Sequence, residues 1–265
     1  SDLYNIRKCL VPSVWLWYTS VKHDMKTAQQ TGGETLFEQL KKRKYGLIIP
    51  IYAMIYIPWF YYLERTVQNP THIIHLAIDD YIPFIDVFII PYMLWFGYIS
   101  ATVLWLLWKD KKEYLQLITF LIIGMTLFLV VSTLYPNGHQ LRPASFDHNN
   151  IFTAMIARLY QTDSPNNILP SIHVYNSLGA WFAIQNSRLT RERPRLRMAS
   201  LVMTSLIILS TMFIKQHSVL DVVLAFGLAG ILYPVFYMPG CPVYYEKLLL
   251  SWRQAPRVKT SESRE

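Results

Sequence analysis

Residues 169–221 read LPSIHVYNSLGAWFAIQNSRLTRERPRLRMASLVMTSLIILSTMFIKQHSVLD, and they place two histidines at the ends of apolar segments. His173 opens a run that stays apolar to residue 184. His217 lies between the apolar runs 196–214 and 222–237. Ionisable side chains are costly at membrane depth, so such a cluster at the ends of apolar helices predicts a functional site.

The second histidine has a carboxylate partner in the sequence. His217 and Asp221 are four residues apart, so on a helix they share a face and the carboxylate can orient the imidazole. A histidine held by an aspartate is how a protein prepares a base or a nucleophile. Upstream, the guanidinium of Arg142 is suited to clamp a phosphate with two hydrogen bonds. These residue types together indicate phosphoryl transfer.

Three short motifs carry a resemblance to a known family. Arg142-Pro143, Pro170-Ser171-x-His173 and His217-x-x-x-Asp221 occur in this order, over a region of about 135–237. They resemble the signature motifs of the type-2 phosphatidic acid phosphatase superfamily. That superfamily includes lipid phosphate phosphatases, undecaprenyl pyrophosphate phosphatases and related lipid phosphotransferases. The resemblance implies that His217 attacks phosphorus, that Asp221 fixes its tautomer and that His173 protonates the departing oxygen.

The substrate-binding residues follow from the same comparison and from charge. Arg142 and Lys215 are expected to neutralise the phosphoryl oxygens, as phosphoryl transfer requires. We expect Ser171 to donate its hydroxyl and the start of the following helix to favour an anion. Tyr135 stands where the family usually has a lysine, and it completes the expected substrate-binding set.

The sequence also departs from the family pattern at two further positions. Thr211 stands where the third motif usually has an arginine, and Ile172 stands where the second motif usually has a glycine. Lys215, two residues before His217, is expected to replace one missing cation. Similar departures occur in the branch that resembles inositol phosphorylceramide and sphingomyelin synthases, which transfer a phospho-headgroup between lipids.

Composition predicts an integral membrane protein. Of 265 residues 52% are hydrophobic, and they fall into long uncharged blocks. We predict an all-α bundle of six transmembrane helices. The net charge of +8 comes from basic residues at the ends of the apolar blocks, which sets membrane topology and gives no support to nucleic-acid binding. The predicted spans are about 45–63, 83–108, 114–135, 171–184, 196–213 and 219–237.

The sequence divides into three parts. Residues 1–45 are expected to form amphipathic helices that lie in the headgroup region or pack on the bundle. Residues 46–238 are the expected six-helix membrane domain, and 239–265 a charged cytoplasmic tail. No signal-peptide pattern opens the chain. The polar loop 136–169, which contains a short helical pattern at 151–160, is expected to be an extracytoplasmic active-site loop.

Charge in the loops predicts the orientation. Basic residues concentrate at 41–44, 109–112 and 188–197 and in the tail, which a six-span arrangement places on one face. The positive-inside rule makes that face cytoplasmic, together with both termini. All three motifs then meet on the extracytoplasmic side of a plasma or inner membrane.

No cofactor is expected, because cationic side chains supply the charge and no carboxylate cluster is present to hold magnesium. His72 and His75, three residues apart in a possible surface helix, offer an alternative metal site. Cys9 and Cys241 match no metal spacing.

The leading functional hypothesis is a membrane phosphatase that hydrolyses a lipid phosphate or pyrophosphate through a phosphohistidine. Its substrate would be a phospholipid or an isoprenoid or sphingolipid phosphate within the bilayer. The first alternative is a lipid phosphotransferase that uses the same histidines with an alcohol acceptor. A transporter or non-catalytic scaffold is the other class, although polar residues at one face do not suit a transporter. The absent motif cations also leave a degenerate, inactive family member open. The sequence does not predict an oligomeric state.

Overall fold

The computed structural model describes residues 44–238, and the predictions made for residues 1–43 and 239–265 lie outside the described residues. The chain divides after Leu47 into two compact units, and the fold described here is that of the second. Its helices are α4 (Ile48–Thr66), α5 (Ala77–Tyr81), α6 (Ile89–Lys109), α7 (Lys111–Leu134), α8 (Ile151–Thr162), α9 (Ile172–Asn186), α10 (Pro194–Phe213) and α11 (Val219–Tyr237). Short 3₁₀ helices occupy Lys44–Leu47, Asp86–Phe88 and Arg188–Thr190, and two strands, β1 (His72–Ile73) and β2 (Asn137–Gly138), pair in parallel.

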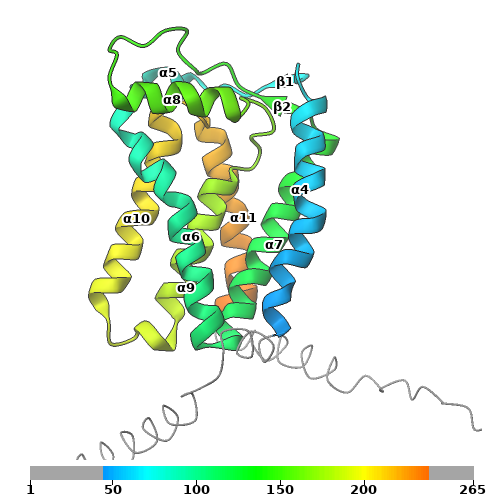
Figure 1. Ribbon diagram of the computed structural model, residues 1–265, viewed down its shortest axis with the longest axis vertical. Helices are drawn as coiled ribbons and strands as arrows, with labels where there is room; N and C mark the ends of the chain where they lie inside the picture. The colour runs from blue at the N-terminus through cyan, green and yellow to red at the C-terminus, as the bar shows by residue number, and fades with distance from the viewer. Residues whose placement is uncertain (1–43, 239–265) are drawn as a thin grey trace, which may run out of the picture. The chain divides into compact units, whose positions relative to one another are not determined.

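The long helices form an upright bundle with α8 lying across one end (Figure 1). Within residues 44–238, five segments are long and apolar enough to cross a membrane. They are Lys44–Thr66, Asp86–Lys109, Lys111–Leu134, Pro194–Phe213 and Val219–Tyr237. Five of the six predicted spans are therefore shown to be suitable helices.

The fourth predicted span forms α9, which is shorter and occupies the centre of the bundle. It packs against α6, α7, α10 and α11, and most of its residues from Val174 to Ile184 are buried. Its 15 residues extend about 22 Å, less than the roughly 30 Å hydrocarbon core of a bilayer.

A close approach between two helices explains one glycine of the core. The ring of Tyr175 on α9 lies against Gly124 on α7, where an added Cβ would come within 2.0 Å of a ring carbon. The Tyr175 hydroxyl donates a 2.8 Å hydrogen bond to the carbonyl of Phe120, whose ring stacks on that of Tyr175. Interhelical bonds of this kind satisfy polar groups where no water is present.

The outer faces of the bundle carry large apolar side chains. Met54 on α4 is 77% exposed and Ile231 on α11 is 73% exposed, and similar residues continue along α6 and α10. Contiguous apolar surface on this scale is unfavourable in water and suits contact with lipid. The chain is therefore an integral membrane protein.

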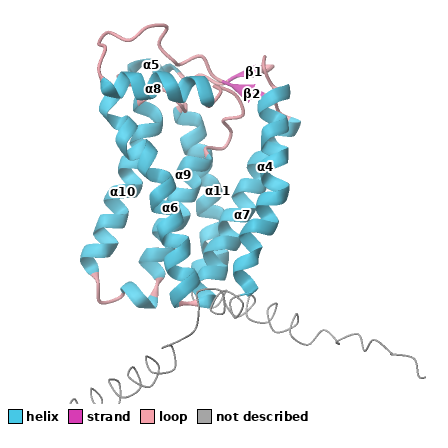
Figure 2. Ribbon diagram, viewed as in Figure 1, coloured by secondary structure: helices cyan, strands magenta, loops and turns pink. Residues whose placement is uncertain are grey.

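The basic clusters and the segments that carry the sequence motifs lie at opposite ends of the bundle (Figure 1). The turns that carry the basic clusters 109–112 and 188–197 join α6 to α7 and α9 to α10, at one end. The segments 67–88, 135–171 and 214–218 join helices at the other end, where β1 pairs with β2 (Figure 2). The sequence motifs therefore meet at the end opposite to the basic turns.

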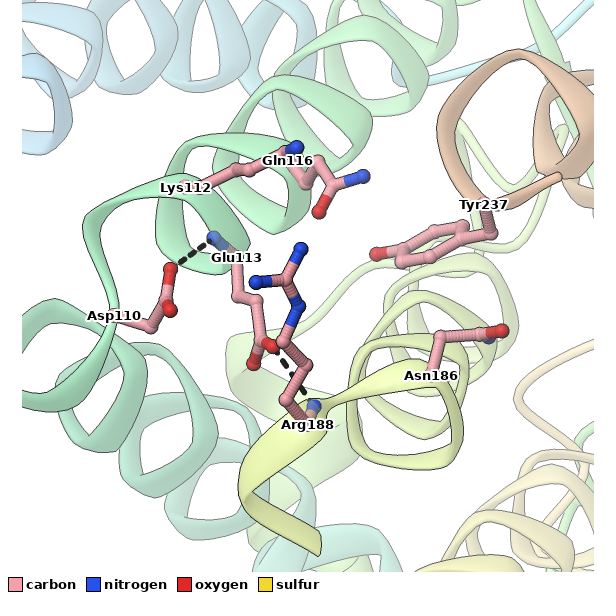
Figure 3. A pocket seen from close by; sticks show the side chains of 7 residues that line it. All are labelled: Asp110, Lys112, Glu113, Gln116, Asn186, Arg188 and Tyr237. Carbon is pink, nitrogen blue, oxygen red and sulfur yellow. Dashed lines mark hydrogen bonds between the residues drawn. The ribbon is translucent and has the colours of Figure 1, made fainter. Parts of the chain in front are cut away.

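A polar pocket of about 180 Å³ opens at the basic end of the bundle. In Figure 3 the tyrosine hydroxyl, the arginine and the acidic side chains surround it. The start of α9 lies at the other end of that helix, so about 20 Å of helix separates the pocket from His173. We therefore do not assign this pocket to the reaction. Its lining residues are Asp110, Lys112, Glu113, Gln116, Asn186, Arg188 and Tyr237.

Candidate active site

His217 is held by the carboxylate predicted from the sequence. Its Nδ1 lies 3.1 Å from Oδ2 of Asp221, and the side chains are 9% and 0% exposed, respectively. The backbone N–H of Ser218 donates to the same carboxylate oxygen at 3.0 Å. With Asp221 ionised, its carboxylate only accepts hydrogen bonds, which assigns the proton to Nδ1 and leaves the lone pair on Nε2 of His217.

The loop that carries His217 is fixed by the end of α10. The backbone N–H groups of Gln216 and His217 both donate to the carbonyl of Thr211, at 2.9 and 3.0 Å. Thr211, which stands in place of a family arginine, is itself fully buried. This position therefore contributes a backbone acceptor that shapes the loop.

His173 faces His217 from the first turn of α9. Its Nδ1 lies 3.4 Å from Nε2 of His217. Its ring is packed between Tyr92 and Trp95 of α6, with centroid distances of 4.7 and 4.4 Å. The two histidines predicted from separate motifs therefore meet as a pair.

Ser171 caps the helix that carries His173. Its Oγ accepts the backbone N–H of Val174 at 3.4 Å, and its own N–H donates to the carbonyl of Asp221 at 3.4 Å. The residue is fully buried. An N-cap serine satisfies one free donor of the first turn, and here it also ties the starts of α9 and α11 together.

Arg142 lies beside the loop that carries His217. Its Nη2 donates to Oε1 of Gln216 at 2.5 Å and to the carbonyl of Asp163 at 2.8 Å, and Nη1 donates to the carbonyl of Tyr160. The guanidinium carbon also sits 4.3 Å from the centre of the Tyr160 ring. These contacts fix the plane of the guanidinium and connect it to the residue that precedes His217.

Lys215 also lies in this loop, but its ammonium group bonds to α5. Nζ donates to the carbonyls of Asp79 and Ile82, at 2.8 and 2.6 Å. Lys215 adopts a positive φ of 55°, which is unfavourable for a residue with a Cβ. Through these hydrogen bonds Lys215 connects the end of α5 to the loop that carries His217.

The structure places Tyr135 against β1. Its ring stacks on the imidazole of His72 at a centroid distance of 3.7 Å, and the residue is 41% exposed. No ring contact joins Tyr135 to His173 or His217 within residues 44–238. The tyrosine that replaces the family lysine thus packs at the edge of the site.

The possible surface helix carrying His72 and His75 is not formed, because His72 belongs to β1 and His75 precedes α5. His75 Nε2 instead pairs with Asp80 at 2.8 Å, which raises the pKa of that exposed histidine. Within the described part of the chain, no group of three or more metal-ligating side chains is gathered.

Sequence reasoning gave no role to Asp79. This 2% exposed carboxylate accepts the Ser218 hydroxyl at 2.6 Å and the backbone N–H groups of Val219 and Leu76 at 2.8 and 2.9 Å. It therefore completes the cap of α11 from across the site. The pair Asp79-Asp80 in a polar stretch was the available signal, but sequence alone does not show which of the two is buried.

Asp163 was also missed. Its Oδ2 accepts Nε2–H of Gln216 at 3.1 Å and the Tyr92 hydroxyl at 3.3 Å. Burial raises the pKa of Asp163 to about 6, although the charge of Arg142 acts in the opposite direction. Its carbonyl and carboxylate together hold both Arg142 and Gln216.

The electrostatic surroundings keep His217 uncharged. Burial, together with the positive charge of Arg142, lowers the pKa of His217 to about 3. A neutral imidazole whose Nδ1–H is occupied presents only the Nε2 lone pair, which is the form that a nucleophile needs. The arrangement combines an oriented neutral imidazole, a second histidine and a guanidinium held by three hydrogen bonds.

Comparison with known proteins agrees with this arrangement. A search among curated proteins gave no match, and a search among solved structures gave none either. A family model described as the PAP2 superfamily matches residues 58–235, which include all three motifs and most of the bundle. The chain therefore belongs to the type-2 phosphatidic acid phosphatase (PAP2) superfamily.

Proposed function

We propose that this protein is a membrane phosphatase that hydrolyses a lipid phosphate or lipid pyrophosphate through a phosphohistidine at His217. Membership of the superfamily indicates phosphatase-type activity on lipid phosphates. The observation that carries the finer proposal is the chain of contacts from Asp221 through His217 to His173. It leaves one imidazole nitrogen, Nε2 of His217, as the nucleophile.

In the first step Nε2 of His217 attacks phosphorus and the bond from phosphorus to the leaving oxygen breaks. The leaving oxygen takes the electron pair and receives a proton from His173. The Nδ1–H bond to Asp221 stabilises the positive charge that forms on the phosphorylated imidazole. Arg142 stabilises the charge on the non-bridging oxygens.

In the second step water attacks phosphorus and passes a proton to His173, while the bond from phosphorus to nitrogen breaks. His217 regains its lone pair and inorganic phosphate leaves. Reacting atoms approach to about 3–3.5 Å before a bond forms. The 3.4 Å between the two histidine nitrogens is therefore too short to hold a phosphoryl group. Substrate binding has to separate these rings, and we expect the His173 side chain to move.

We place the site on the extracytoplasmic face, with both termini cytoplasmic. The basic turns lie at the end of the bundle opposite to the histidines, as the positive-inside rule requires for that orientation. We include α9 as a sixth crossing segment because it runs between the two ends within the bundle. The substrate phosphate would then be reached from the outer leaflet, without a metal ion.

The second candidate function is transfer of the phospho-headgroup to an alcohol of another lipid. Two observations favour it: Tyr135 packs on His72, and Thr211 contributes only backbone to the loop. The site therefore has fewer cations than the motif pattern of the family, in the manner of the transferase branch. The two functions differ in whether water or a lipid alcohol reaches the phosphohistidine.

The test is phosphate release from lipid phosphates and pyrophosphates by the purified full chain in detergent with a metal chelator. We expect release by the wild type and none by His217→Ala or His173→Ala. Release that persists in His217→Ala would contradict the proposal. No release by well-folded wild type, followed by headgroup transfer when acceptor lipids are added, would establish the second function.

A further inference from the structure

We propose that His139 is a substrate-binding residue whose Nε2–H donates to a non-bridging phosphoryl oxygen held between Arg142 and His217. This rests on the proposed function, because it assigns a third contact to the same phosphoryl group. In the sequence His139 is one of many polar residues of the loop 136–169. The structure buries it, with 3% of the residue exposed.

The backbone before His139 is fixed on two sides. Gly138 pairs with β1, and the His139 N–H donates to the carbonyl of Pro165 at 2.9 Å. The Asn137 side-chain oxygen accepts the N–H groups of Ile168 and Leu169, immediately before the motif that contains His173. His139 is therefore held by the same segments that position the active site.

Gly138 permits this close packing. A Cβ at this position would lie 2.7 Å from a side-chain carbon of Pro70 and 2.8 Å from both the Pro165 carbonyl and the Asn166 side-chain oxygen. Real Cβ contacts are not this short, so any other residue would push the segment apart. The position of the His139 ring depends on a backbone that only glycine allows here.

The hydrogen bonds of His139 identify its tautomer. Nδ1 accepts the backbone N–H of Leu141 at 3.1 Å, so in the neutral ring the proton is on Nε2. Burial and the nearby positive charge of Arg142 lower the pKa of His139 to about 3. The ring is thus neutral at working pH, with one N–H group to offer.

That N–H group has no acceptor within residues 44–238, and the same is true of Nε–H of Arg142. The backbone of Gln216 faces the His139 ring, but it does not complete a hydrogen bond to Nε2. Buried donors are almost always paired, so two unpaired ones beside the nucleophile need an explanation. A phosphoryl group has several strong acceptor oxygens and would satisfy both.

The site then offers two different donors to the phosphoryl group: the neutral Nε2–H of His139 and the charged guanidinium of Arg142. His139 can bind an oxygen without adding positive charge beside His217, where a further cation would lower the electron density of the nucleophile. It favours a tetrahedral oxyanion, such as a phosphate monoester or the terminal phosphate of a pyrophosphate. Both contacts would strengthen as charge builds up on the oxygens during transfer.

Two nearly isosteric variants separate this role from a structural one. In His139→Gln the amide nitrogen occupies roughly the place of Nε2 and keeps the donor. In His139→Asn the amide oxygen occupies roughly the place of Nδ1 and keeps the acceptor for Leu141, but the donor is lost. The probe is orthovanadate, a phosphate-shaped anion, whose binding to the purified full chain can be titrated without turnover.

We expect His139→Asn to bind orthovanadate about ten-fold or more weakly than the wild type, because a hydrogen bond to a charged group is lost. His139→Gln should bind within a few-fold of the wild type, and His139→Asn, which keeps the acceptor for Leu141, should keep the wild-type melting temperature. Wild-type binding by His139→Asn would overturn the proposal. Loss in His139→Gln but not in His139→Asn would overturn it too, since the Nδ1 acceptor would then be the important atom.

A fall in melting temperature that accompanies every loss of binding would also overturn the proposal, by indicating a loop-anchoring role through Gln216. Turnover distinguishes this inference from the proposed function. If the wild type binds orthovanadate through His139 but no lipid phosphate reacts, the proposed reaction fails and the binding role stands. If lipid phosphates react and His139→Asn is unaffected, the reaction stands and the role of His139 fails.

Discussion

Nδ1 of His217 lies 3.1 Å from Oδ2 of Asp221, and in the proposed mechanism this contact determines which nitrogen of His217 reacts. In that mechanism the proton is held on Nδ1, so Nε2 is the nitrogen that attacks phosphorus. The same contact would stabilise the imidazole once it carries a phosphoryl group. The carboxylate is fully buried, so its effect is not weakened by water.

The substitution Asp221→Asn should remove the control of the His217 tautomer while changing the size of the side chain very little. The amide can orient the ring with the wrong nitrogen protonated, so we expect kcat to fall on the order of 10²–10⁴-fold. Steady-state kinetics of the purified protein measure it. A KM within a few-fold of the wild type is part of the prediction. Unchanged kcat would show that Asp221 does not control the tautomer.

Asp79 should act on stability through the cap of α11. Asp79→Asn replaces an acceptor of three hydrogen bonds, from Leu76, Ser218 and Val219, with a group that also donates. We expect a loss of about 1–3 kcal/mol, seen as a lower melting temperature in detergent. The matched control is Asp80→Asn, because this neighbour is exposed and its carboxylate pairs with the exposed His75. Equal effects from both variants would contradict the assignment.

The substitution Arg142→Lys should keep the positive charge but lose the planar set of hydrogen bonds that the guanidinium makes. A lysine cannot bond simultaneously to Gln216, Asp163 and Tyr160 in the fixed plane that the guanidinium provides. We expect kcat/KM to fall on the order of ten- to a hundred-fold, with a smaller effect on melting temperature. Wild-type kinetics in this variant would show that positive charge alone is required.

Gly138→Ala should disturb the segment that carries His139. The added methyl group would overlap Pro70 and the Pro165 carbonyl, so we expect a loss of about 1–3 kcal/mol together with weaker orthovanadate binding. Gly97→Ala in α6 is the control, because nothing lies within 4 Å of its added Cβ. The account predicts a lower melting temperature for the first variant only.

The stability of the protein should depend on the ionisation of His217 in acid. Its folded-state pKa, lowered to about 3, lies below the ordinary value of 6.5. The folded state therefore binds this proton less readily than the unfolded state, and stability is lost as pH falls from 6.5 toward 3. The loss from this group is on the order of 2 kcal/mol at pH 5.

His217→Gln removes that ionisation. The melting temperature of the variant, relative to the wild type, should rise as pH falls from 7 to 5. Thermal unfolding in detergent at several pH values measures it. A difference between the two proteins that stays constant with pH would contradict the neutral, buried histidine.

The helices were predictable because uncharged blocks of sequence determine where helices lie. The two histidines were predicted from the resemblance of three motifs to a known family. The expectation that His217 and Asp221 share a helix face was wrong, because His217 precedes the Ser218 N-cap of α11 and reaches Asp221 from the loop. The length of α9 was predictable too, but its central position depends on packing, for example of Tyr175 on Gly124. The hydropathy of α9 alone therefore does not decide whether this helix crosses the membrane.

The outer part of the site could not be read from the sequence in the same way. Asp79, Asp163 and His139 become important only because distant segments meet there: α5 with α11, and the polar loop with residues 214–218. Their residue types are common in surface loops. Lys215 illustrates the reverse, since its position beside His217 suggested a phosphate contact whereas its ammonium group bonds to the carbonyls of Asp79 and Ile82.

The most direct test of the account is to trap the phosphorylated protein. The full chain is mixed with a reactive lipid phosphate labelled in its phosphoryl group. It is quenched within milliseconds in alkali, because phosphohistidine is unstable in acid, and its peptides are analysed by mass spectrometry. The account predicts one phosphoryl group on Nε2 of His217, absent in His217→Ala and longer-lived in His173→Ala. Phosphate release by the wild type with no phosphoryl group on His217, or with it on Nδ1, would contradict the account.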